Sequence, residues 1–509
     1  MNIKIDTIMV EMVIKLFMSK IIRITANIFI GIAISGFIFG DAFALSISKE
    51  REISVEFMEA IERQNKIIKD SMAVSLVTEI GEQILKTVPP QPFRFSFYVM
   101  DEDQFNAFAG PGSNIFVHRG LITSLDNVDE LAGIIGHEIA HAACRHISSM
   151  VDQSKVMTIG TLAGVLAGVL LGAAGGGGGG AELGQAVLVG SVAASQTAML
   201  AYSREHETEA DQKGLVYLAK AGFAPKGLLT GLEKIRSRDW FGSETIPDYL
   251  KTHPGSTERI VYIQSWIEGN EKKAAANQKN AITPLKIDPF RFEMVKYRLA
   301  GLYGNEDEAH KLFSDILTKE PDNSAANYGM ALLMERKSRL DESMKYLRKA
   351  LETRAFDHYI LLELGKLYTL KKEPQKAVEI MEGLEVVPEV ETEALFYLSQ
   401  ARLNVGMADI AERGFEKVIN TAPKLFPKSY YHLAEIKGRS SNREDAALSH
   451  YYLGLYYYEM KNLKSAKFHL IKSLETLSDK DKQNHAQLII AKSELKEREA
   501  KRDSRQRRR

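Results

Sequence analysis

The spacing of apolar residues predicts helices through most of the chain, and two of them lie in its first half. Two acids in a plausible first turn, Asp129 and Glu130, precede an apolar stripe that would bury the first helix. The stripe consists of Leu131, Ala132, Ile134, Ile135, Ile139 and Ala140. A second helix is predicted where the acidic segment 207–211 leads into Leu215, Leu218 and Ala219.

From about residue 291 to residue 480 the helical pattern repeats itself. Small or apolar residues recur at an interval of 34, the length of a tetratricopeptide repeat. The recurring positions are Ala331, Ser343 and Ala350; Gly365, Ala377 and Leu384; Ser399, Ala411 and Val418; Gly454, Ala466 and Ser473; and, in an N-terminal unit, Ala309, Phe313 and Pro321. Helical pairs of this kind stack into a curved solenoid, whose concave face is expected to bind protein.

Tyrosines gather late in the repeats, at positions 430, 431, 451, 452 and 456–458. At three- and four-residue spacing they are expected to pack between helices, and an exposed binding stripe is the alternative. The charged tail, residues 481–509, is expected to be a solvated helix that frays into disorder. Attraction of this tail to an anionic membrane surface is a weaker alternative.

Two regions are apolar over long stretches. Residues 1–44 carry basic residues, an apolar run and a small-residue end, which predicts a cleaved signal peptide, with Met18 as an alternative start and an uncleaved anchor as the competing interpretation. Residues 156–201 hold two uncharged stretches around a glycine run and predict a Gly-rich helical hairpin. We expect a mobile flap or membrane-surface element there, with two buried core helices or a membrane-spanning hairpin as alternatives.

Composition adds three limits. The chain has 66 basic and 66 acidic side chains, so its zero net charge does not favour nucleic-acid binding. Cys144 is the only cysteine, which excludes an intramolecular disulfide, and its place beside the apolar stripe predicts a packing residue rather than a nucleophile. A linker is expected at 268–290, between a domain at 45–267 and the repeats at 291–480.

Residues 137–141 read HEIAH, a zinc-protease pattern with a mechanical basis. On a helix, His137 and His141 project from one face and can bind the same metal ion. Glu138, one position on, can reach a water at the metal and act as general base. A buried helix with two incidental histidines is the alternative.

A catalytic zinc needs a third protein ligand, often a glutamate. His146 is set aside because, on a continuous helix, it lies about half a turn from the metal face; we expect a surface or supporting histidine. Glu207 is the better candidate, with Asp211 placed to hydrogen-bond the second ring nitrogen of a ligand histidine. An acidic, solvated first turn is the alternative, and it is the expected role of Glu205 and Glu209.

HEIAH at 137–141 and ETEAD at 207–211 together resemble the HtpX-like gluzincin peptidases, and most of all the BepA-type periplasmic metalloproteases that carry tetratricopeptide repeats. The segment 106–117, with NAFA, PG and IFV, resembles the small sheet of that family, one edge of which is thought to align substrate by strand addition. Thr252-His253-Pro254 and Arg259 resemble its third motif block. The resemblance covers about residues 50–265.

The resemblance implies a mainly α fold: a gluzincin-type zinc metalloprotease domain with a small β-sheet, followed by an α-solenoid of tetratricopeptide repeats. It implies one Zn²⁺ held by His137, His141 and Glu207, and Glu138 as the base. It adds Asp211, His253 and Arg259 as supporting residues.

His253 has three alternative roles at this point. It could ligate the zinc and keep the enzyme latent, it could stabilise the oxyanion, or it could be structural. The resemblance further implies protein substrates among envelope or outer-membrane proteins, a partner in the outer-membrane assembly machinery, peripheral membrane contact and a periplasmic location. A latent protease acting as a chaperone or scaffold is the second hypothesis, and membrane-embedded proteolysis is the third.

Overall fold

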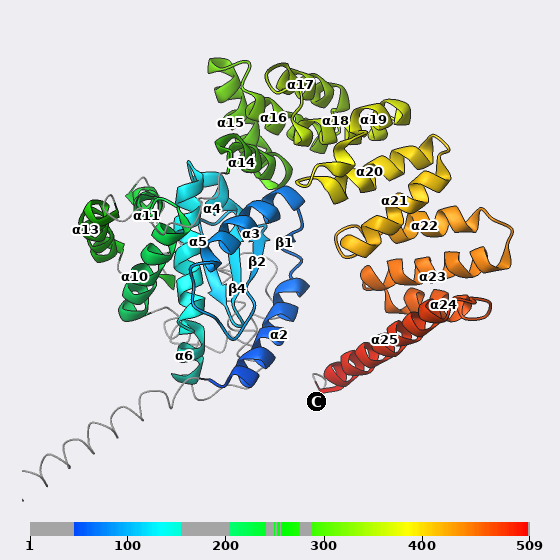
Figure 1. Cartoon of the computed structure of the whole chain (residues 1–509), viewed down its shortest axis with the longest axis horizontal. Coiled ribbons are helices and arrows are strands. Elements are labelled where there is room, and N and C mark those ends of the chain that lie inside the picture. Colours follow the sequence, from blue (N-terminus) through cyan, green and yellow to red (C-terminus); the bar gives the residue numbers. More distant parts are fainter. Residues whose placement is uncertain are drawn as a thin grey trace, which may run out of the picture.

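The computed structural model describes residues 45–153, 203–240, 249, 252–254, 256–274 and 287–506 (Figure 1). The expected signal peptide and the expected glycine-rich hairpin both lie outside these residues. The described part is mainly helical, with one small sheet in the N-terminal domain and a helical solenoid after it, which confirms the predicted fold class. None of the described helices is long and apolar enough to cross a lipid bilayer.

The sheet has the strand order β1, β2, β4, β3, with β2 and β4 parallel and the two outer pairs antiparallel. The strands are β1 (Ile67–Ile68), β2 (Ser96–Met100), β3 (Ala107–Gly110) and β4 (Asn114–His118). β3 and β4 form a hairpin in the segment where the family resemblance implied a sheet, and Phe108 stacks on Phe116 across it with ring centroids 4.8 Å apart. β3 is an edge strand of this sheet, although Ala107, Phe108 and Ala109 are fully buried.

Helices pack around the sheet, and α5 is the central one. Their bounds are α2 (Ile47–Arg63), α3 (Ser71–Leu85), α4 (Arg119–Ser124), α5 (Val128–Ala143), α6 (His146–Gln153), α10 (Arg204–Ala221), α11 (Lys226–Trp240) and α13 (Ser256–Ala274). A Cβ atom on Gly133 of α5 would lie 2.4 Å from the backbone nitrogen of Leu228 in α11. One on Gly214 of α10 would lie 3.3 Å from the carbonyl oxygen of Gly136. Glycine therefore lets α10 and α11 approach α5 at backbone distance.

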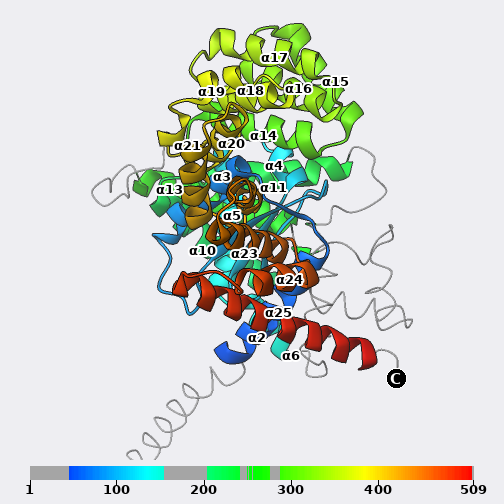
Figure 2. The same ribbon diagram turned by 90° about the vertical axis from the view of Figure 1, so that its right-hand side faces the viewer.

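The solenoid is a curved row of antiparallel helices (Figure 1, Figure 2). Its elements are α14 (Pro289–Tyr303), α15 (Glu306–Lys319), α16 (Ser324–Arg336), α17 (Leu340–Thr353), α18 (His358–Leu370), α19 (Pro374–Met381), η2 (Leu384–Val386), α20 (Glu391–Asn404), α21 (Ala408–Thr421), α22 (Lys428–Gly438), α23 (Arg443–Glu459), α24 (Leu463–Ser473) and α25 (Lys480–Gln506). Every recurring position named above is buried except Pro321. At Gly365 the two helices of a pair approach so closely that a Cβ atom would lie 2.2 Å from Cγ of Met381.

The tyrosines of the late repeats divide between the two expected roles. Tyr430, Tyr451 and Tyr452 are buried among the helices, and they belong to one apolar core with Leu433. Tyr431 differs from these three residues, because 48% of it is exposed to solvent. Packing between helices thus accounts for most of the tyrosine pattern in this region.

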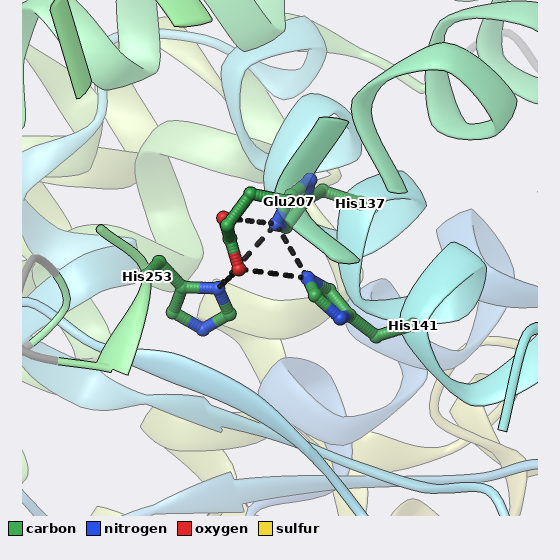
Figure 3. Close-up of side chains that lie close together, drawn as sticks. All are labelled: His137, His141, Glu207 and His253. Carbon is green, nitrogen blue, oxygen red and sulfur yellow. Dashed lines mark hydrogen bonds and ion pairs between the residues drawn. The ribbon is translucent and has the colours of Figure 1, made fainter. Parts of the chain in front are cut away.

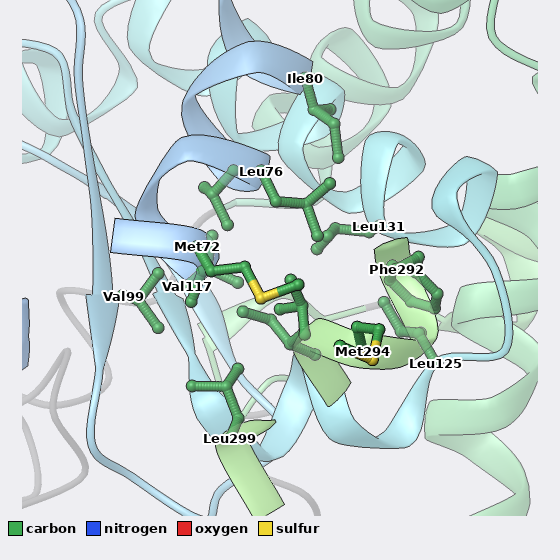
Figure 4. Close-up of a cluster of buried hydrophobic side chains, with 14 of the residues drawn as sticks. Met72, Leu76, Ile80, Val99, Val117, Leu125, Leu131, Phe292, Met294 and Leu299 are labelled. Carbon is green, nitrogen blue, oxygen red and sulfur yellow. The ribbon is translucent and has the colours of Figure 1, made fainter. Parts of the chain in front are cut away.

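The two domains share one hydrophobic core. Phe292, Met294 and Leu299 of α14 are buried with Met72 and Leu76 of α3 (Figure 4). The helix α13 runs on to Ala274, inside the stretch expected to be a linker, and residues 275–286 lie outside the described part. Because apolar packing continues from α3 into α14, the first helix of the solenoid packs directly on the N-terminal domain.

Beside this core lies a set of buried charges that we call the interdomain charge cluster: Asp70, Arg298, Glu363, Lys366 and Glu393. The Arg298 guanidinium donates to Asp70 Oδ2 and to Glu363 Oε1, both at 2.6 Å. Lys366 donates to Glu363 at 2.9 Å and also to Glu393, which accepts a further hydrogen bond from the hydroxyl of Ser71. Asp70 and Ser71 begin α3, so these contacts join the start of α3 to three helices of the solenoid.

The opposite end of α3 holds α10. The side-chain amide of Gln83 donates to the backbone carbonyl oxygen of Ala221 at 3.0 Å. The hydroxyl of Thr87 donates to the backbone carbonyl oxygen of Tyr217 at 3.2 Å. At the far end of the solenoid, Lys461 lies 3.5 Å from Glu62 of α2, an exposed pair. In Figure 1 the solenoid accordingly curves from α3 and α4 round toward α2.

Candidate metal centre and active site

The HEIAH segment lies in the C-terminal half of α5. The side chain of Asn127 caps this helix by accepting the backbone N–H of Glu130 at 3.0 Å. His137, Glu138 and His141 are fully buried, and the Nε2 atoms of the two histidines are 2.9 Å apart. The helical spacing therefore brings both imidazoles to one point, as predicted.

Glu207 reaches the same point from α10. Ser203 caps α10 through its side chain, which accepts from the N–H of His206, and Glu207 follows in the first turn. One carboxylate oxygen of Glu207 lies 3.2 Å from Nε2 of His141, and the other lies 3.4 Å from Nε2 of His137 (Figure 3). Glu207 is fully buried, so the alternative of a solvated acid does not hold for it.

His253 supplies a fourth side chain, from the segment that precedes α13. Its Nδ1 lies 3.0 Å from Glu207 and 3.4 Å from Nε2 of His137 (Figure 3). Tyr249 stacks on the His253 ring with centroids 4.3 Å apart, and its carbonyl accepts the N–H of His253 at 2.8 Å. Donor atoms of His137, His141, Glu207 and His253 all lie within 4.8 Å of one another.

Asp211 and Arg259 stand directly behind this group. Asp211 Oδ1 lies 2.9 Å from Nδ1 of His137, and the two carboxylate oxygens accept Nε and an η nitrogen of Arg259, both at 2.8 Å. A second η nitrogen of Arg259 lies 2.6 Å from Glu207. The bidentate pair orients Asp211, and Asp211 orients the His137 ring.

The charges shift the proton equilibria of the site. Burial alone would raise the pKa of Glu207, but Arg259 and His253 lower it well below its usual range. Burial and Arg259 lower the pKa of His137, yet Asp211 and Glu207 outweigh them and raise it to about 9. Glu207 is thus an anion at neutral pH, and its carboxylate oxygens can bind a metal ion.

Glu138 differs from the other acids. Burial raises its pKa, and among the described residues neither carboxylate oxygen accepts a hydrogen bond. Nε2 of His253 lies 3.6 Å from Oε1 of Glu138. A buried carboxylate without hydrogen bonds is costly, so this position is arranged for a group that joins it during function.

The donor set fits a metal ion. Two imidazole nitrogens and a carboxylate converge, one histidine has a carboxylate behind its second nitrogen, and a further imidazole stands beside them. This set suits zinc in a catalytic geometry, with three protein ligands and one exchangeable position.

Two residues that the sequence left outside the site lie beside it. His146 is buried, and its Nδ1 lies 2.9 Å from Nδ1 of His141. Glu209, expected to be solvated, binds Nε2 of His146 at 3.1 Å and pairs with Lys213 at 2.7 Å. The Glu209 side chain is 46% exposed, so it is partly solvated as expected, and the sequence did not predict its contact with His146.

The prediction for His146 assumed one continuous helix, but the helix ends before this residue, and its expected surface or supporting role stays a prediction. α5 ends at Ala143, and Arg145 has a φ of 55°, a left-handed conformation that begins a new direction for α6. Glu50 holds this turn through Arg145 Nε at 3.1 Å and through the hydroxyl of Ser148 at 2.5 Å. A predicted helix break after HEIAH would have placed His146 correctly. The residue types from Ala142 to Arg145 do not indicate such a break.

Comparison with known proteins places this domain. Residues 75–267 match the model of Peptidase family M48. The Beta-barrel assembly-enhancing protease of Escherichia coli (strain K12) is 26% identical over 317 residues, which is 60% of each chain. The Mitochondrial metalloendopeptidase OMA1 of Arabidopsis thaliana is 32% identical over 163 residues, 32% of this chain and 29% of that one.

These likenesses have limits of extent. The chain spans about 60% of the length of the beta-barrel assembly-enhancing protease that it matches. Among solved structures, the tetratricopeptide protein YrrB, described as having an unusual peptide-binding site, covers 43% of this chain at 20% identity with a TM-score of 0.25. Such a weak structural likeness adds nothing to what the packing of the helices already shows. The resemblance inferred from the motifs is nevertheless confirmed: residues 75–267 match Peptidase family M48, and the relatives are named as proteases.

Proposed function

We propose that this chain is a zinc endopeptidase, with one Zn²⁺ held by His137, His141 and Glu207. The observation that carries the proposal is the meeting of these three buried side chains next to Glu138, whose carboxylate accepts no hydrogen bond from any described residue. When bound, zinc supplies a positive charge that polarises the scissile carbonyl and lowers the pKa of the attacking water.

The protein side chains carry the proton transfers. Glu138 takes a proton from the water as its oxygen adds to the peptide carbonyl carbon. It then gives that proton to the leaving amine nitrogen as the C–N bond breaks, which leaves a free carboxyl group and a free amino group. Asp211 and Arg259 are positioning residues here: they hold His137 and Glu207 in place.

For His253 we propose the latch among the three roles that the sequence left open. Its Nδ1 lies among the donor atoms of His137 and Glu207, where it would occupy the exchangeable position. Replacement of His253 with alanine should then raise proteolysis. A loss of activity would support the oxyanion role instead, and unchanged activity with altered stability would leave the structural one.

Substrate and location are inferred from the relatives. Because the relatives at 26% identity are named for enhancing β-barrel assembly, we infer substrates among envelope or outer-membrane proteins and a periplasmic location. The solenoid would recruit clients or the outer-membrane assembly machinery, with peripheral contact to the membrane. An unfolded outer-membrane β-barrel protein should then be cleaved faster than casein.

The test of the enzymatic proposal compares wild type with Glu138→Gln, which keeps the three ligands and removes the base. We expect about one zinc per chain in both proteins, with casein cleavage reduced by about 10²–10⁴-fold in the variant. Zinc in both proteins with no cleavage by either, even with His253 replaced by alanine, would contradict the proposal and favour a chaperone or scaffold.

A further inference from the structure

The two candidate ligand histidines have different supports. His137 meets the carboxylate of Asp211 directly, Nδ1 to Oδ1 at 2.9 Å. His141 meets a second imidazole instead, since its Nδ1 lies 2.9 Å from Nδ1 of His146. The carboxylate comes one step later, where Glu209 Oε2 lies 3.1 Å from Nε2 of His146.

The hydrogen-bond directions along this series follow from chemistry. If His141 binds a metal ion through Nε2, its one ring proton is on Nδ1, which donates to Nδ1 of His146. His146 then carries its own proton on Nε2 and donates it to Glu209. Lys213 lies 2.7 Å from Oε1 of Glu209, so one carboxylate oxygen pairs with Lys213 and the other accepts from His146.

The surroundings hold His146 in this orientation. Its ring is 2% exposed and stacks on His206, with centroids 4.3 Å apart and an interplanar angle of 19°. The turn that directs it inward contains Arg145, whose guanidinium binds Glu50 and, at 2.6 Å, the carbonyl oxygen of Leu45. The backbone and the stacked ring therefore leave His146 little freedom to turn away from His141.

We propose that His146 and Glu209 form a positioning pair for His141, which fixes the tautomer and the ring orientation that metal binding needs. This inference rests on the proposed function, because it requires a metal ion at His141. Neither residue contacts the substrate in this role. Outer partners of this type change metal affinity about 10–100-fold when they are removed.

Three substitutions of His146 separate positioning from packing. Asparagine places its carbonyl oxygen where Nδ1 of the histidine was, so His146→Asn keeps the acceptor for His141 and loses contact with Glu209. Glutamine places its amide near the former Nε2, so His146→Gln keeps the side toward Glu209 and loses the acceptor. His146→Ala loses both.

The measurement is the zinc dissociation constant, from competition with a chromophoric chelator, together with the thermal midpoint of the metal-free proteins. We expect zinc affinity to fall about 10–100-fold in His146→Gln and His146→Ala and to stay close to wild type in His146→Asn. Glu209→Gln should weaken zinc binding to a smaller extent, because the amide oxygen still accepts. Glu205→Gln, on an exposed acid of the same helix, is the matched control and should change nothing.

The outcomes distinguish the two levels of the proposal. If wild type binds no zinc, the proposed function itself fails. If wild type binds zinc and all three His146 variants bind it equally well, the positioning pair is refuted. It is refuted as well if zinc affinity follows the metal-free thermal midpoint rather than the presence of an acceptor at the Nδ1 position.

Discussion

The metal centre and the interdomain charge cluster both bury several charged side chains, but they differ in how these are satisfied. In the interdomain charge cluster, Arg298 and Lys366 donate to three carboxylates, those of Asp70, Glu363 and Glu393, and the hydroxyl of Ser71 donates to Glu393 as well. At the metal centre, Glu138 is buried and no described residue donates to it. Buried charge of the first kind holds two domains together, whereas the second kind marks a position kept for chemistry.

The largest effect is expected from Arg298→Met, which removes the central cation of the interdomain charge cluster. Asp70 would remain buried without a cationic partner and Glu363 would keep only Lys366, so the free energy of unfolding should fall by about 3–5 kcal/mol. Urea unfolding measures the loss, and Arg291→Met is the control, because the partner of Arg291, Glu79, is 39% exposed and its ion pair is worth less. Equal losses in both variants would contradict the expectation that the buried cluster stabilises the fold more than the exposed ion pair does.

Glu138→Gln should move stability in the opposite direction. Burial raises the pKa of Glu138, so ionising it costs folding free energy, and this cost is present as pH rises above the ordinary carboxyl range. The neutral amide removes this cost, and the metal-free protein at pH 8 should gain about 1–3 kcal/mol. A variant that loses both activity and stability would show that Glu138 is a structural residue.

A smaller, pH-dependent effect is expected at Glu335, next to the interdomain charge cluster. Burial and the charge of Glu363 raise the pKa of Glu335 to about 7, so the folded state binds a proton that the unfolded state releases. The stability contributed by this proton is complete below the ordinary pKa and is lost as pH rises through about 7. Glu335→Gln should therefore stabilise by about 1 kcal/mol at pH 8 and by little at pH 5.

The smallest effect is expected at the far end of the solenoid. Lys461 and Glu62 are both more than half exposed and 3.5 Å apart. Lys461→Ala should change the free energy of unfolding by less than about 0.5 kcal/mol. A larger loss in urea unfolding would mean that closure of the arc, rather than the contact at α3, holds the solenoid in place.

The sequence predicted the parts of this molecule that depend on local periodicity. Helical spacing joined His137 to His141, and the interval of 34 residues located the buried positions of the repeats. The contact between His146 and Glu209 was not predicted, because it depends on Arg145, a residue with a left-handed backbone at the break between α5 and α6. Periodicity does not report such a break.

The shared core of the two domains was also beyond the sequence. Phe292 and Met294 read as ordinary apolar positions of a first repeat helix, and nothing in their spacing says that α3 covers them. The charge of Arg298 likewise has no visible partner in the sequence, since Asp70 and Glu363 lie far from it along the chain. Contacts between distant segments are set by tertiary packing, which a single sequence does not display.

One helix, α3, gives the molecule a mechanical property. Its first residues are bound to the solenoid through Asp70 and Ser71, and Gln83 in its last turn is bound to Ala221, at the end of the helix that carries Glu207. A displacement of the solenoid would therefore be passed through α3 to the C-terminal end of α10, the helix whose first turn carries Glu207. The repeats are thus attached to the N-terminal domain through the packed contacts of α3, and not through the covalent chain alone.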